Sequence, residues 1–121
     1  MPSEHDPGDC LADIVDNIER IESYTADCDR QASERDGRTR DAVERCLERV
    51  CEAVARLGKR AAELLPEQPL GQIRGMGNQL RHAYDRISNE ILWHTVRDRL
   101  PSLRADAQQA LTKLEAPRHG S

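Results

Sequence analysis

The sequence predicts an all-α protein, folded as an antiparallel up-down bundle of four to five helices. Apolar residues recur at spacings of 3, 4 and 7 along most of the chain, which is the pattern of amphipathic helices. The 121 residues include no Phe, one Trp and two Tyr, so the core must be aliphatic, and this favours packed helices over an aromatic-rich sandwich. A chain of this length corresponds to one domain.

The first half of the chain predicts two helices. A disordered leader over 1–8 precedes a helix at about 9–26, and a polar loop over 27–37 leads to a long helix at about 38–65 that Gly58 can bend. The apolar stripe of the first helix is Leu11, Ile14, Val15, Ile18, Ile21 and Tyr24. That of the second is Ala42, Val43, Cys46, Leu47, Val50, Val54, Leu57, Ala61 and Leu64.

The second half begins after a stop signal at 66–69, which contains two prolines. A third helix is expected over about 70–84, and Ser88 or Asn89 can cap a fourth. Pro101 is placed to begin a further helix, and the helical domain should end at 115, before a loose tail over 116–121. The residues expected to face inward are Ile73, Met76, Leu80, Ile91, Leu92, Val96, Leu103, Ala107, Ala110 and Leu111.

Charge and hydropathy exclude some classes of function. The formal net charge of −4 argues against a protein that coats nucleic acid non-specifically, although a local basic site remains compatible with it. No apolar run approaches the ~20 residues that a membrane span needs. The polar, acidic start of the chain is unlike a signal peptide, so a cytoplasmic location with reduced thiols is expected.

The cysteines and histidines do not predict a metal site. Cys46 and Cys51 lie about 140° apart around one helix, so they are poorly placed to share an ion. All four cysteines, including Cys10 and Cys28, are interpreted as small hydrophobes or reduced surface thiols. His94 and Asp98 are four residues apart, and a solvated polar pair is favoured there over a metal site.

The helix expected over 70–84 is unusual for a purely structural element. Its three glycines each cost up to ~1 kcal/mol relative to alanine in a helix interior. It is also the most basic stretch of a net-acidic chain, and Asn78 and His82 share a face. Two interpretations stay open: a solvated face whose glycines permit close packing, or a phosphate or RNA site. The residues concerned are Gly71, Arg74, Gly75, Gly77, Asn78, Arg81 and His82.

This helix also carries a resemblance to a known family. Residues 75–84 read Gly-Met-Gly-Asn-Gln-Leu-Arg-His-Ala-Tyr, which resembles the Gly-Met-Arg-Asn-x-Leu-x-His-x-Tyr segment of HepT-like proteins of the HEPN superfamily. Residues 91–96 are similar to the family's Ile-Val-Trp-x-Thr-Val stretch, and residues 100–103 to its Leu-Pro-x-Leu. Residues 40–43 and 51–53 resemble its second helix, and the likeness covers about residues 10 to 114.

The resemblance implies a toxin of a HepT/MntA-like type VII toxin–antitoxin module. It implies a homodimeric, metal-independent endoribonuclease without a cofactor, acting on RNA in a cleft between two bundles. His82 would be the proton-transfer group, Asn78 would position the backbone or the histidine, and Arg74 and Arg81 would bind RNA. The partner would be a nucleotidyltransferase antitoxin that transfers AMP to Tyr84, and the added phosphates would repel RNA.

One departure from the family motif affects the expected activity. Gly77 occupies the position of the motif arginine, five residues before His82. Losing one donor that stabilises a developing charge typically costs ~100- to 1000-fold in rate. The chain could be an inactivated variant, a natural degenerate member, or one in which another arginine substitutes. We expect weak or absent activity; the alternatives are a non-catalytic subunit modified by a nucleotidyltransferase, and a plain helical interaction module.

Overall fold

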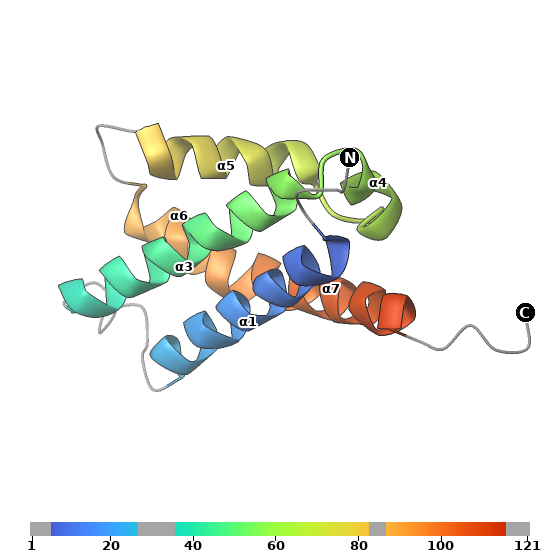
Figure 1. Cartoon of the computed structure of the whole chain (residues 1–121). Helices are drawn as coiled ribbons and strands as arrows, with labels where there is room; N and C mark the ends of the chain where they lie inside the picture. The colour runs from blue at the N-terminus through green and yellow to red at the C-terminus, as the bar shows by residue number, and fades with distance from the viewer. Residues whose placement is uncertain (1–5, 27–35, 83–86, 116–121) are drawn as a thin grey trace, which may run out of the picture.

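A computed structural model describes residues 6–26, 36–82 and 87–115, and these residues form helices without any strand, as the sequence predicts. Figure 1 shows the elements in chain order. They are α1 (Pro7–Thr25), α3 (Gly37–Arg56), α4 (Arg60–Leu64), α5 (Leu70–His82), α6 (Asn89–His94), the π-helix η1 (Thr95–Arg99) and α7 (Leu100–Glu115).

The longest helices pack in an antiparallel bundle. Helix α1 lies between α3 and α7, and α5 packs against the side of α3 that faces away from α1 (Figure 1). The apolar stripes of α1, α3 and α7 meet in one aliphatic core, as the sequence predicts. Helix α5 buries only Gly77 fully, so it is an outer helix whose other faces are at least partly accessible.

Side-chain caps define where the helices begin. The Asp6 carboxylate accepts hydrogen bonds from the backbone N–H groups of Gly8 and Asp9, so α1 begins at Pro7, two residues earlier than expected. Asp36 caps α3 in the same way. The Ser88 hydroxyl accepts from the N–H of Ile91, and this confirms Ser88 as the cap of α6.

The long second helix of the sequence prediction is two helices. Gly58 has φ +58°, a left-handed conformation that ends α3, and α4 follows as a separate short helix. The expected bend at Gly58 is therefore a full break. Glycine adopts this conformation without the steric cost that a Cβ would add.

Two residues expected in the core are exposed. Tyr24 is 42% exposed because it lies in the last turn of α1, beyond the fully buried Ile21. Ile91 is 50% exposed because short α6 buries only Leu92, and Ile91 faces an open groove instead.

Helices α6, η1 and α7 follow one another without an intervening loop. The N–H of Leu100 donates to the carbonyl of Thr95, five residues back, as in a π-helix. Pro101 has no N–H and its ring crowds the carbonyl four residues before it. The wider π turn directly before Pro101 accommodates this, so the chain continues from η1 into α7 without leaving the helical conformation. None of the described helices combines the length and the apolar character that crossing a membrane requires.

Candidate functional site

Helix α5 presents the motif residues mainly on its outer surface. It begins after Pro69, whose carbonyl accepts the first helical hydrogen bond from the N–H of Ile73. Arg74, Asn78, Arg81 and His82 are all exposed, and His82 is the last residue of the helix. The imidazole is therefore accessible to a substrate in the single chain.

The structure brings two of these residues into direct contact. An Nη2 N–H of Arg81 donates to the amide oxygen of Asn78 at 3.0 Å. Asn78 lies one helical turn before His82, on the same side of α5. The contact therefore turns the Arg81 guanidinium toward the face that carries His82. Arg74 is exposed one turn further back and joins none of these contacts.

Gly77 is different, because it faces inward against α3. A Cβ at this position would lie 2.8 Å from the Cβ of Cys51, closer than two such atoms can approach. Gly71 and Gly75, by contrast, are exposed and have no neighbour within 4 Å of a built Cβ. Of the three α5 glycines, only Gly77 thus permits close packing of the helices.

Position 77, where the motif has an arginine, therefore faces α3 and leaves no room for a side chain. Five residues rotate the helix by about 500°, so positions 77 and 82 point about 140° apart. A side chain at 77 starts at the α3 contact, whereas His82 points outward. Tyr84, the predicted AMP acceptor, and Cys28 lie outside the described residues.

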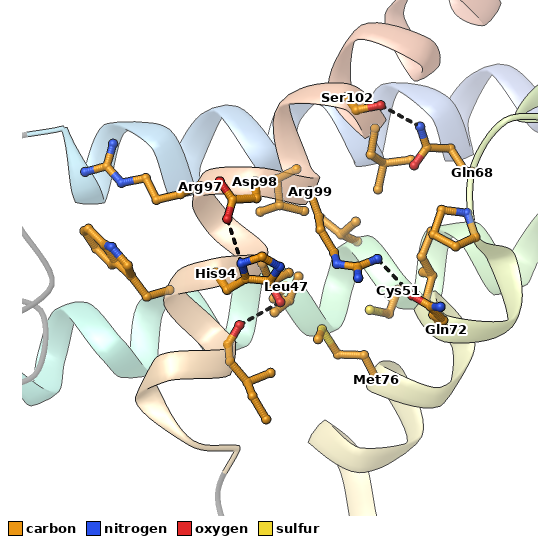
Figure 2. Close-up of a pocket in the computed structure, with 18 of the residues that line it drawn as sticks. Leu47, Cys51, Gln68, Gln72, Met76, His94, Arg97, Asp98, Arg99 and Ser102 are labelled. Atoms are coloured by element: carbon orange, nitrogen blue, oxygen red, sulfur yellow. Dashed lines mark hydrogen bonds and ion pairs between the residues drawn. The ribbon is translucent and has the colours of Figure 1, made fainter.

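A groove that sequence reasoning did not predict lies beside α5. It has a volume of about 920 Å³ and opens between α5 on one wall and α6, η1 and the start of α7 on the other, with α3 as its floor (Figure 2). The floor and inner walls are apolar and the rim is polar. The sequence does contain a signal that could have indicated this rim. Trp93 and Arg97 are four residues apart, as are His94 and Asp98, so each pair shares a helix face and makes a contact.

Described residues offer no set of ligands for a metal ion. Within the three described ranges, no three His, Cys, Asp or Glu side chains cluster. His94 Nδ1 lies 2.6 Å from an oxygen of Asp98, and both side chains are more than half exposed, which confirms the predicted polar pair. Cys10, Cys46 and Cys51 are free and buried, as the hydrophobe interpretation predicts.

Comparison with known proteins settles the family. The family model "Ribonuclease HepT-like" matches residues 14–110, most of the chain. The chain belongs to the HepT-like family. This confirms the resemblance carried by the segment that ends at Tyr84.

Individual relatives agree with this assignment. The chain is 35% identical over 96 residues to a Thermococcus cleftensis protein named "Probable ribonuclease HepT", covering 79% of this chain and 87% of that protein. It is 29% identical over 105 residues to a Methanocaldococcus jannaschii protein named "Putative RNase", covering 87% and 90% respectively. No solved structure gives a significant match to this HepT-like chain.

Proposed function

We propose that this HepT-like chain is the ribonuclease-type toxin of a toxin–antitoxin module, that it binds RNA at the end of α5, and that it cleaves RNA weakly. The observation that carries the proposal is the exposed His82, beside an Asn78 that already holds the Arg81 guanidinium. A histidine can exchange protons near neutral pH, and a guanidinium can bind phosphate through paired N–H groups.

The proposed reaction needs no metal ion. His82 accepts the proton of a ribose 2′-hydroxyl, and the 2′-oxygen attacks the adjacent phosphorus to give a 2′,3′-cyclic phosphate. The 5′-oxygen leaves with a proton from solvent water, and the His82 imidazolium returns its own proton to the solvent. Arg81, held by Asn78, is the described arginine nearest to His82 in the chain and would contact the phosphate. Arg74 would contact the RNA further along α5.

The weak rate follows from Gly77. The family motif places an arginine where this chain packs a glycine against Cys51. Without that donor, a loss of ~100- to 1000-fold in rate is expected. The tight contact with Cys51 supports Gly77 as an integral part of the α3–α5 packing, which favours a degenerate family member over a chain whose arginine was simply removed.

An RNA-cleavage assay in the presence of EDTA tests the proposal. The chain should cleave a single-stranded RNA slowly, and His82→Ala should reduce that rate to the uncatalysed level. The double variant Gly77→Arg/Cys51→Gly, in which the clashing Cβ is absent, should cleave faster than Cys51→Gly alone. If His82→Ala left the cleavage rate unchanged in the parent or in the double variant, the proposed role of the imidazole would be wrong.

The buried Gly77 also favours a second candidate function, that of a non-catalytic subunit modified by a nucleotidyltransferase. Both candidates include a homodimer and transfer of AMP to Tyr84 by an antitoxin encoded next to this chain. Incubation with that neighbour-encoded enzyme and ATP should add the mass of AMP, and Tyr84→Phe should prevent the addition. The second candidate predicts this modification but no gain of RNA cleavage in the double variant.

A further inference from the structure

We propose that the groove between α5 and α6–η1 is a nucleotide subsite, which holds one unpaired nucleotide of an RNA strand beside the motif helix. This inference rests on the proposed function, because it assigns part of the RNA path. The groove volume of about 920 Å³ lies within the range of small-ligand sites and is ample for a nucleotide. Its wall is α5 itself, so a strand in the groove runs next to the helix that ends at His82.

One side of the groove offers an aromatic surface. Trp93, partly buried in α6, carries the Arg97 guanidinium over its ring at 4.5 Å from the ring centre. The cation–π contact places the guanidinium over one face of the ring. Aromatic rings and guanidinium planes are the surfaces on which unpaired bases stack, and such stacking accepts any base.

The opposite side offers hydrogen-bonding groups that join the two walls. An Nη1 N–H of Arg99 donates to the Gln72 side chain of α5 at 2.8 Å, across the groove. Figure 2 shows Arg97 and Arg99 leaving η1 in opposite directions, so one guanidinium lies at each side of the opening. At the end near α7, Gln68 donates to the Ser102 hydroxyl at 3.1 Å.

Between these sides, the floor is apolar. Leu47 and Val50 of α3 lie beneath the groove, and Ile73 and Met76 of α5 line its wall. An apolar floor with a few placed polar groups at the rim is the usual design of a site for a flat aromatic ligand such as a base. The π-helix contributes three of the polar rim residues, and such turns recur at functional sites.

The groove lining carries three carboxylates and two guanidiniums, so it suits one nucleotide held mainly through its base rather than a long backbone tract. Arg97 and Arg99 provide two positive groups, while Asp98 is paired with His94. The remaining acidic groups are Glu67 and Glu90. A neutral amphipathic helix would also fit an apolar floor, but it would leave the Trp93–Arg97 surface and the two guanidiniums without a specific role. We therefore favour RNA as the occupant.

Trp93 is the single tryptophan of the chain, so its fluorescence reports on the groove directly. The experiment titrates the full chain with a labelled single-stranded RNA whose 2′-hydroxyls are methylated, which blocks cleavage. Label anisotropy measures binding anywhere on the protein, and Trp93 fluorescence measures stacking in the groove. We expect both signals to change together and to give one Kd.

Variants locate the contact. Trp93→Leu and Arg99→Gln should each weaken binding about tenfold, and Trp93→Phe, which keeps an aromatic ring, should bind within about threefold of the parent. Arg45→Gln, an exposed arginine of α3 outside the groove, is the matched control and should have no effect. Circular dichroism of each variant confirms that the fold is kept.

Three results would overturn the inference. Anisotropy that changes while Trp93 fluorescence stays constant places the RNA elsewhere and leaves the proposed function intact. RNA that fails to bind at all overturns both proposals. A Trp93→Leu variant with unchanged RNA affinity but an altered oligomeric state identifies the groove as a protein interface.

Discussion

Gly77 of α5 and Cys51 of α3 lie so close that no side chain fits between them. A Cβ built on Gly77 would stand 2.8 Å from the Cβ of Cys51, which is itself only 4% exposed. This contact fixes how near α5 lies to α3. It also occupies the position at which the HepT-like segment that this helix resembles has an arginine. The same glycine therefore allows the close packing of α5 on α3 and departs from the motif.

The first prediction compares two glycines of the same helix. Gly77→Ala should lower the free energy of unfolding by about 1–3 kcal/mol, because the added methyl forces α5 away from α3. Gly75→Ala should raise it by up to ~1 kcal/mol, because position 75 is exposed and alanine is the better helix former. Urea denaturation measures both changes.

Opposite signs for the two substitutions are the decisive result. If Gly77→Ala were as stabilising as Gly75→Ala, the close approach to Cys51 would be wrong. Adding Cys51→Gly to Gly77→Ala tests the contact itself. The double variant should lose less stability than the two single variants lose together, since Cys51→Gly removes the Cβ with which the new methyl clashes.

The sequence predicts this fold well wherever periodicity decides the structure. The stripe Leu11–Ile21 and the stripe Val43–Val54 are buried as expected, because both helices are long and touch the core over most of their length. Periodicity fails at helix ends. Tyr24 and Ile91 continue their stripes in sequence, but both side chains are exposed in the structure.

The site is only partly predictable for the same reason. The motif on α5 is a local pattern, so His82 and Asn78 could be named from the sequence. The inward direction of Gly77 depends on which side of α5 meets α3, and the groove depends on how far α5 stands from α6. Both are distances between helices, and the spacing of residues along one chain does not determine them.

A second prediction concerns Arg40, which anchors the chain segment that follows the motif. Its side chain is 16% exposed and donates to the carbonyl of Ile87, to the Asn89 side chain and, at 3.1 Å, to Glu44. Arg40→Ala should lower the free energy of unfolding by about 2–4 kcal/mol, because it removes one charged donor from the largely buried Glu44 carboxylate and the guanidinium donor from the carbonyl of Ile87. Thermal and urea unfolding measure the loss.

The matched control for this prediction is Arg45→Ala on the same helix. The Arg45 side chain is 62% exposed and its ion pair with Glu48 is at 3.6 Å, so the change should stay within about 0.5 kcal/mol. Arg40→Lys should recover only part of the loss, because an ammonium lacks the fork that reaches several acceptors. Equal effects of Arg40→Ala and Arg45→Ala would show that the anchor is unimportant.

A third prediction follows from the cap of α3. Hydrogen bonds from the Thr39 side chain and backbone hold the pKa of the Asp36 carboxyl below its usual value. A depressed pKa means that the ionised carboxylate stabilises the fold above its unfolded pKa, and that this contribution disappears as the pH falls through the lower folded value. Asp36→Asn, which keeps a capping oxygen, should therefore flatten the acid limb of the stability curve. Thermal melts between pH 2 and about pH 6 check this, and an unchanged acid limb would contradict it.

The fourth prediction uses Cys51, whose thiol is shielded by the same contact that excludes a side chain at Gly77. Burial raises the pKa of the Cys51 thiol to about 12 from an ordinary 9.0, with Arg81 opposing the rise. At about pH 8.5 the native thiolate is then about 1000-fold scarcer than in the unfolded chain, so iodoacetamide should modify Cys51 only as fast as α5 opens or the protein unfolds. Mass spectrometry of the peptide that contains Cys51, with and without guanidinium chloride, measures the protection.

The pH dependence of stability that Cys51 causes has the opposite sign to that of Asp36. A thiol with a raised folded pKa contributes its full stability below the unfolded value of 9.0, and the contribution falls as the pH rises above it, because the unfolded chain ionises first. Cys51→Ala should remove this alkaline loss while keeping the helix. Gly77→Ala should speed the modification of Cys51 by iodoacetamide, since pushing α5 away from α3 admits the reagent. Rapid modification of Cys51 in the native parent would show that the α3–α5 contact opens readily. Close packing would then no longer explain why position 77 is a glycine and not the arginine of the motif.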